Sequence, residues 1–196
     1  MVSLPNVERI LNPITESDGT YVFGYCESLT KVYLPKLKAI KTNTSGFYGN
    51  NYMCVGCTSL LYADDNTIGG RNDAIGISFF ASCSALVSAD FTNVLYIGAT
   101  AFKASAITML VLRNSTLVQL YNINAFGDSP FDSSGVGGTL YVPNDLLTQY
   151  TQATNWSTIL GYANNQIKSI ESTHTDPNAP VDLTLYYADG TPISAM

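Results

Sequence analysis

Four cysteines are the side chains best suited to chemistry in this sequence, and Cys54 and Cys57 have the CxxC spacing of zinc sites and redox thiol pairs. Cys57 is also in register with Cys26 and Cys83 in a recurring pattern, where a small apolar side chain would fill the interior. Only Cys54 has no counterpart. We therefore expect buried packing, with no resident metal and no cofactor; zinc, a redox pair or a disulfide between neighbouring repeats are the open alternatives.

Carboxylates offer a second possible chemistry, at Asp64-Asp65-Asn66 and between Asp128 and Asp132. Glycosidases need two carboxyl groups at a set separation, and neither segment has the ligand spacing of an EF-hand. The single histidine, His174, lies in a polar stretch with prolines, so it offers no Ser-His-Asp or Cys-His arrangement on a regular element. These features predict a protein that is not an enzyme, with bound calcium as an open alternative.

Tyrosine is the residue type that indicates recognition, because the chain has thirteen Tyr against eight Phe and one Trp. Tyr combines a large contact area with a polar tip at low entropic cost. Three tyrosines lie in or beside two polar insertions, and two aspartates follow the last of them. We predict that these residues contribute to a ligand-binding surface, unless the tyrosines only border the core: Tyr48, Tyr52, Tyr62, Asp64 and Asp65.

The elements that must position these side chains are copies of a sequence repeat. The clearest copy lies between Phe79 and Leu112, where Phe80 and Phe102 are 22 residues apart. Recurrence at such a period is what a stack of coils requires. Short strands are expected near Val32–Leu34 and Thr139–Pro143. Other copies begin at or near Phe23, Cys57 and Phe126.

The second copy and the start of the chain depart from this pattern. Polar insertions at residues 41–51 and 64–73 are expected to bulge as loops, and such loops often form the binding face of a repeat protein. Leu4-Pro5 matches Leu34-Pro35, so the chain opens in the second half of a copy. That half is interpreted either as a terminal cap or as the start of a fragment cut from a longer protein.

The C-terminal region changes character after Pro143. Asn144 or Asp145 can cap a helix, and Asn155-Trp156-Ser157 can begin another helical turn. We predict a helical cap over about residues 143–171, with Trp156 covering the last repeat.

A tail then follows. Residues 172–180 are polar and contain proline, which predicts a linker. Residues 181–196 contain an alternating segment before Ala188-Asp189-Gly190, which predicts one strand and a turn. This tail is expected to pair with the repeats or with a partner chain, or else to be the first strand of a truncated domain.

Composition and charge exclude several partner classes. A formal charge of −6 with only nine Lys and Arg gives no basic footprint for nucleic acid or for an anionic membrane. No apolar run approaches the roughly 18 residues that span a bilayer, and the first residues do not follow the pattern of a signal peptide. We therefore expect no nucleic-acid partner and no membrane insertion.

Three motifs recur together in this chain: Phe-x-x-Cys-x-Ser-Leu, Leu-Pro-x-Leu-x-x-Ile and Ile-Gly-x-x-Ala-Phe, within Phe23–Ile40, Phe80–Ile97 and Ile97–Phe102. They resemble the BspA-like leucine-rich repeats over about residues 4–171. The resemblance implies an α/β repeat solenoid over residues 1–171, a right-handed leucine-rich-repeat superhelix with a parallel sheet of short strands and a helical cap. It carries no catalytic residues, because the motif consists of core positions.

Members of that family occur in bacterial surface proteins and adhesins, in protozoan surface proteins and in phage tail regions. The resemblance and the tyrosines together predict a non-enzymatic recognition or adhesion module that binds a cell-surface protein or glycan, at a bacterial surface or on a phage tail. The alternative is a structural spacer subunit of a virion or surface assembly, whose C-terminal tail contacts an assembly partner.

Overall fold

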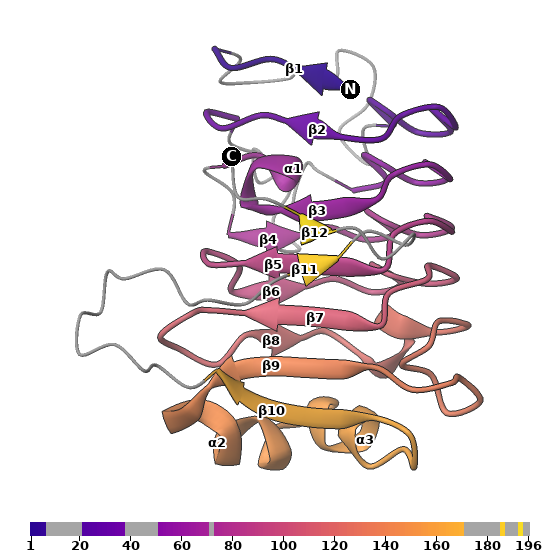
Figure 1. Cartoon of the computed structure of the whole chain (residues 1–196). Helices are drawn as coiled ribbons and strands as arrows, with labels where there is room; N and C mark the ends of the chain where they lie inside the picture. The colour runs from indigo at the N-terminus through magenta and orange to yellow at the C-terminus, as the bar shows by residue number, and fades with distance from the viewer. Residues whose placement is uncertain (7–20, 38–50, 71–72, 171–184, 187–191, 194–196) are drawn as a thin grey trace, which may run out of the picture.

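Short parallel strands are the main regular elements of this chain (Figure 1). The computed structural model describes residues 1–6, 21–37, 51–70, 73–170, 185–186 and 192–193. The largest sheet has five strands in the order β10-β9-β7-β5-β3, and each neighbouring pair is parallel. Its strands are β3 (Tyr62–Asp64), β5 (Ser88–Phe91), β7 (Met109–Leu112), β9 (Thr139–Pro143) and β10 (Gln166–Ile170).

Two smaller parallel sheets accompany the large one. One has three two-residue strands in the order β4-β6-β8, and in the other β1 pairs with β2. Several copies of the sequence repeat therefore contribute two strands, one to each of two sheets. The strands are β1 (Val2–Ser3), β2 (Val32–Tyr33), β4 (Ala74–Ile75), β6 (Tyr96–Ile97) and β8 (Gln119–Leu120).

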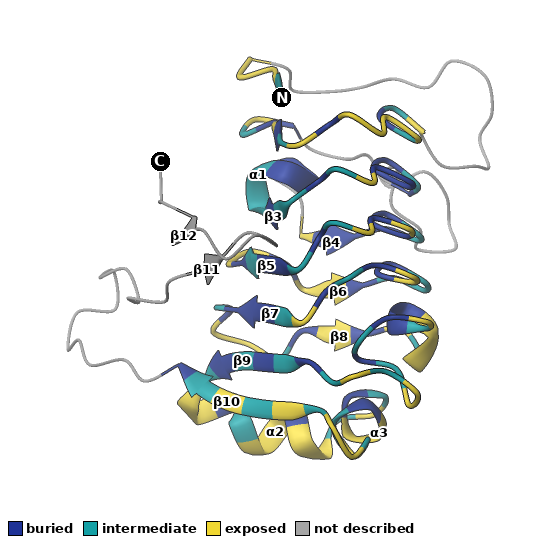
Figure 2. Ribbon diagram, turned by 45° about the vertical axis from the view of Figure 1, so that its right-hand side comes forward, coloured by how far each residue is buried: buried dark blue, intermediate teal, exposed yellow. Residues whose placement is uncertain are grey.

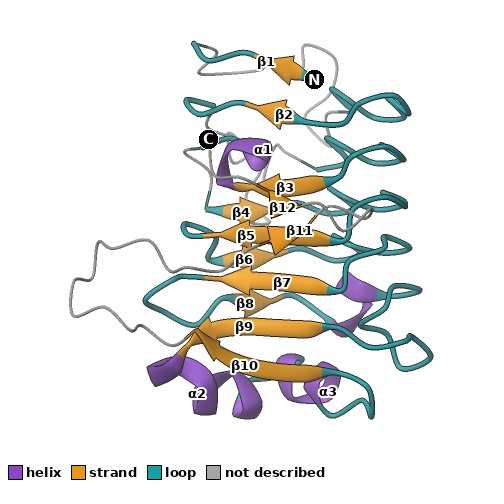
Figure 3. Cartoon of the chain, in the orientation of Figure 1, coloured by secondary structure: helices purple, strands orange, loops and turns teal. Residues whose placement is uncertain are grey.

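Few and short helices complete this α/β protein (Figure 3). Helices α2 and α3 confirm the helices predicted after Pro143, but neither Asn144 nor Asp145 caps α2 with its side chain. Two of the helices are 3-10 turns, η1 and η2. The bounds are α1 (Asp65–Ile68), η1 (Ile123–Phe126), η2 (Asn144–Leu146), α2 (Leu147–Gln152) and α3 (Trp156–Leu160).

A column of aromatic rings fills the core between the sheets. The ring centroids of Phe80 and Phe102 are 5.4 Å apart, those of Phe102 and Phe126 are 5.3 Å apart, and Trp156 follows 6.0 Å from Phe126. All four side chains are fully buried. The burial view shows that interior residues follow one another through the stacked strands and turns (Figure 2). The prediction that Trp156 packs against the last repeat is confirmed.

Cys54 occupies the position in this column that phenylalanine takes in the other copies. It precedes Cys57 by three residues, just as Phe80 precedes Cys83. Its backbone N–H donates to the carbonyl of Phe79 at 3.1 Å, just as the backbone N–H of Phe80 donates to the carbonyl of Ala101. In both cases the acceptor stands one residue before the core position of the next copy. Cys54 is therefore a core residue of the repeat, which the sequence pattern had left without an explanation.

A left-handed residue marks the same corner in each of five copies. It stands immediately before the Cys or Ser of the motif, and only one of the five is the glycine that this conformation favours. Holding the others at positive φ costs free energy that the surrounding structure must offset. The residues and their φ angles are Tyr25 (58°), Gly56 (68°), Ser82 (59°), Ala104 (54°) and Asp128 (57°).

Three predicted features differ in the structure. The 64–73 insertion does not begin as a bulging loop: Asp64 accepts from the N–H of Thr67 at 2.9 Å, and α1 buries Ile68. Strand β10 lies within the region predicted as a helical cap, which therefore also contains a strand. In the tail, β11 (Leu185–Tyr186) pairs antiparallel with β12 (Pro192–Ile193). The described part of the tail therefore contains two paired strands where a single strand was expected. The linker at 172–180 lies outside the described residues.

Candidate functional site

An exposed tyrosine cluster is the first candidate site, and it consists of Tyr21, Tyr25 and Tyr52. The ring centroids of Tyr21 and Tyr52 are 5.0 Å apart with an interplanar angle of 15°, and those of Tyr21 and Tyr25 are 6.5 Å apart at 12°. Tyr25 is 67% exposed and Tyr21 is 55% exposed, whereas Tyr52 is half-buried. Three nearly parallel aromatic rings thus reach the solvent together.

The repeat geometry holds this tyrosine cluster in place. Tyr21 and Tyr52 both stand two residues before the core position of their copies, which Phe23 and Cys54 occupy, so stacking of the copies superposes their rings. The ring of Tyr25 lies against Gly56, where a Cβ atom would come within 2.6 Å of the Tyr25 Cδ1. Only glycine allows a ring to approach the backbone this closely. The rings are therefore arranged before any ligand arrives.

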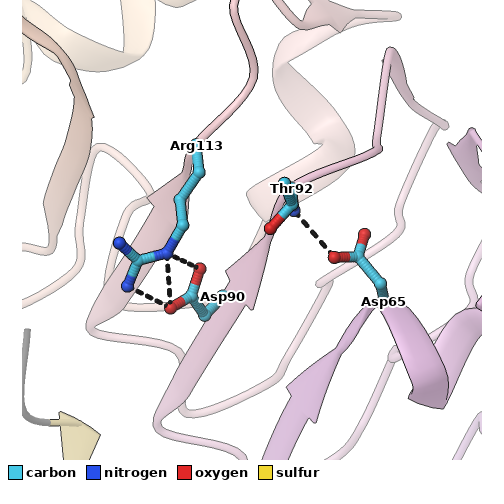
Figure 4. Close-up of polar contacts among 4 residues, drawn as sticks. All are labelled: Asp65, Asp90, Thr92 and Arg113. Atoms are coloured by element: carbon cyan, nitrogen blue, oxygen red, sulfur yellow. Dashed lines mark hydrogen bonds and ion pairs between the residues drawn. The ribbon is translucent and has the colours of Figure 1, made fainter. Parts of the chain in front are cut away.

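The second candidate site is an ion pair on the outward face of the five-stranded sheet. Alternate residues of a strand point to opposite faces, so Asp90 and Arg113 lie on the side opposite the core residue Phe91. Arg113 donates from Nε to Asp90 Oδ1 at 2.7 Å and from Nη2 to Oδ2 at 2.6 Å (Figure 4). The side chains of Asp90 and Arg113 are 13% and 19% exposed. In the described part of the chain, Arg113 Nη1 is buried without a hydrogen-bond partner.

Asp64 and Asp65 are engaged within the protein. Asp64 caps α1, and the carboxylate of Asp65 accepts from the backbone N–H groups of Thr92 and Asn93 at 2.9 and 3.0 Å. Burial raises the pKa of Asp65 despite these two donors, and burial also raises the pKa of Asp90 despite Arg113. These contacts tie β3 and α1 to the turn after β5. They give both aspartates a structural role in the present arrangement.

The other acidic segment forms a local turn. Asp132 accepts from the backbone N–H of Asp128 at 3.0 Å and from that of Ser133 at 2.7 Å. Asp128 also pairs with Lys103 at 3.5 Å, and both side chains are exposed. Among the residues that the structure describes, no group of three or more His, Cys, Asp or Glu side chains is placed to hold a metal ion.

The cysteines are packing residues with one exception. Cys54, Cys57 and Cys83 are fully buried, whereas Cys26 is exposed, so the prediction of a buried side chain is wrong for Cys26. Cys57 Sγ donates to the carbonyl of Phe23 at 3.0 Å, which joins neighbouring copies. Burial raises the pKa of Cys83 to about 12 and raises that of Cys54, whereas a hydrogen bond from Cys54 lowers that of Cys57. All four thiols are free.

One thiol per chain is expected to react rapidly with a thiol reagent in the native protein. The thiolate is the reactive species, and Cys26 alone combines exposure with a free thiol. Ellman's reagent should therefore titrate one thiol quickly and four in denaturant. A Cys26→Ser variant should lose the rapid phase, and a rapid phase that survived in that variant would contradict the burial of the other three.

The predicted ligand-binding residues fall in different places. Tyr52 belongs to the tyrosine cluster, whereas Tyr62 lies on β3 beside Asp64 and Asp65, and Tyr48 lies outside the described residues. Burial, together with the charges of Asp90 and Asp64, raises the pKa of Tyr62 above its usual range. The structure therefore does not bring Tyr52 and Tyr62 into one site.

Sequence reasoning missed Tyr21 and Tyr25. Each stands two residues from the core residue Phe23, and Tyr21 aligns with Tyr52 once Cys54 is recognised as the counterpart of phenylalanine. That alignment was the signal that could have revealed the tyrosine cluster.

Comparison with known proteins gives no relative: no protein-family model, no curated protein and no solved structure matches this chain. Among the helices of the described residues, none has the length and apolar character that a membrane span requires.

Proposed function

We propose that this protein is a non-enzymatic recognition module that binds a neutral cell-surface glycan through the tyrosine cluster. The proposed architecture is a right-handed leucine-rich-repeat solenoid closed by a helical cap, as a component of a bacterial surface or a phage tail. The parallel pairing of strands from successive repeat copies supports the architecture. The observation that carries the function is the exposure of stacked Tyr21 and Tyr25.

The chemistry of these rings suits a sugar. The C–H faces of a pyranose are apolar and pack on an aromatic face, while its hydroxyl groups hydrogen-bond with the phenolic O–H, which is both donor and acceptor. Burial of an exposed, preorganised ring loses little conformational entropy. The charge of −6 repels anionic ligands at low salt, which favours a neutral glycan over an acidic one.

Tyr21→Ala and Tyr25→Ala are expected to weaken glycan binding by about tenfold or more each, because truncation of an aromatic hot spot costs about 2 kcal/mol or more and tenfold corresponds to about 1.4 kcal/mol. The measurement is binding to an array of neutral and acidic bacterial surface glycans, followed by calorimetric titration of the best ligand. Neutral glycans should give the strongest signals.

Tyr121→Ala is the matched control, because Tyr121 is 65% exposed and lies outside the tyrosine cluster. It should bind as the parent protein does. The proposal fails if the parent protein binds no glycan on the array, or if both cluster variants bind as tightly as the parent. Binding to purified surface proteins alone would indicate a protein partner instead.

A further inference from the structure

The outward face of the five-stranded sheet carries apolar side chains that are buried, although they point away from the core. Val111 is fully buried there and Ile170 is 6% exposed, with Tyr62, Met109 and Tyr141 packed against them. The neighbours of Val111 along β7, Leu110 and Leu112, face the core on the opposite side. Strand β7 is therefore enclosed on both faces, as strands are in sheets that have a layer on each side.

The described helices do not supply this second layer. Helix α1 contacts β2 and β3, and α2 contacts β10, so both lie at the ends of the sheet (Figure 2). Helix α3 contacts α2 and η1 instead. Val111 lies on the third strand of five, so the helices at the ends of the sheet do not account for its burial.

We propose that the outward face around Val111 is a docking surface for the C-terminal hairpin of this same chain, formed by β11 and β12. Chain connectivity supports this occupant, since β10 ends at Ile170, which is itself part of the buried apolar cluster. The 14 residues from 171 to 184 can span at most about 46–50 Å. The centre of the sheet, two strands from β10, is only about 10 Å away.

The sequence around β11, from residue 181 to residue 187, fits an apolar surface. Val181, Leu183, Leu185 and Tyr187 alternate with other residues, so an extended strand would place them on one face. Figure 1 shows β11 and β12 projected over the part of the large sheet that contains β3 and β5. In the close-up, a strand in the yellow of the C-terminal end enters the view on the side toward which the Arg113 guanidinium points (Figure 4).

The docked hairpin accounts for two other features of this face. The Asp90–Arg113 pair lies on it with less than a fifth of either side chain exposed, and burial raises the pKa of Asp90. A layer over the sheet removes water from both groups. The docking surface is separate from the tyrosine cluster, so it does not depend on the proposed glycan.

Cysteine accessibility tests the docking directly. In a Cys26→Ser background of the 196-residue chain, Val111→Cys introduces a small side chain in place of a buried apolar one. Its labelling by a maleimide should be slow, because a buried thiol reacts only when the structure opens locally. Leu183→Asp with Leu185→Asp in the same chain should accelerate that labelling by at least about tenfold, because the hairpin can no longer bury its apolar face.

Two controls keep the result unambiguous. Val136→Cys, at an 82% exposed position, should label rapidly with and without the hairpin substitutions. The native buried thiols Cys54, Cys57 and Cys83 should stay unreactive, which shows that the rest of the chain remains folded. Met109→Cys, on the same face, repeats the measurement at a second position.

The proposal is overturned if Val111→Cys labels as fast as Val136→Cys in the chain with the native hairpin. It is also overturned if the hairpin substitutions leave the slow labelling of both Val111→Cys and Met109→Cys unchanged, because another segment would then cover the sheet.

Discussion

Phe102→Ala is expected to lower the free energy of unfolding by about 3–5 kcal/mol, which is typical of a buried phenylalanine replaced by alanine. The Phe102 ring is fully buried between Phe80 and Phe126, with centroid distances of 5.4 and 5.3 Å. Its loss opens a cavity in the middle of the column. The rings of Phe80 and Phe126 on either side are held by their own packing, so they can close this cavity only in part. Urea unfolding followed by circular dichroism gives the measurement.

Tyr121→Ala is the control for this experiment, because removal of an exposed aromatic ring should change stability by no more than about 0.5 kcal/mol. The double variant with Phe80→Ala should cost less than the sum of the single variants, since the two rings contact each other. A loss below 1 kcal/mol for Phe102→Ala would contradict the column as the centre of the core.

Asp90→Ala is expected to destabilise the fold by about 2–3 kcal/mol, somewhat less than removal of one partner from a fully buried pair. The reason is that the guanidinium of Arg113 would keep its burial and lose both of its strong acceptors. The free energy of unfolding from urea titrations at neutral pH measures the effect.

The matched variant is Asp90→Ala combined with Arg113→Met, which removes the charge together with its partner. Replacement of a buried ion pair by apolar side chains is often nearly neutral, and an apolar cluster that includes Val111 and Tyr141 lies on the same face of the sheet. The double variant should therefore be more stable than Asp90→Ala alone. If it were less stable, the cost of the single variant would come from lost packing and not from the unpaired charge.

The recurring apolar positions allowed much of the fold to be predicted. Phe80, Phe102 and Phe126 recur at similar intervals because each fills the buried core position of its copy. A period in the sequence therefore corresponds to stacked rings in the structure. Strand β9 has the predicted bounds because Leu140 and Val142 are buried alternately with less buried neighbours. Parallel pairing of β1 with β2 agrees with the match between Leu4-Pro5 and Leu34-Pro35.

Other features leave too little trace in the sequence. The two-residue strands β4, β6 and β8 are too short to show an alternating pattern, so the second sheet was missed. Strand β10 (Gln166–Ile170) contains only two apolar residues and follows two helices, so the sequence contains no clear sign of a strand there. Cys26 shows a further limit, since a repeat position is buried only where the surrounding chain covers it.

The candidate site was predicted only in part, for a related reason. Tyr52 was identified from composition and from its place beside an insertion, but the other two rings of the tyrosine cluster, Tyr21 and Tyr25, come from a different copy. Contacts between copies depend on register, which inserted residues obscure. The same applies to Arg113, whose pairing with Asp90 follows from the alignment of β7 with β5.

The left-handed corner before each Cys or Ser has a consequence for how this chain tolerates evolutionary change. Successive corners, from Tyr25 through Gly56, Ser82 and Ala104 to Asp128, are separated by 31, 26, 22 and 24 residues. The core position nevertheless always stands two residues before the corner. Each corner thus restores the alignment of its copy with the next one. An insertion or deletion elsewhere in a copy therefore stays local and does not displace the side chains of the copies that follow.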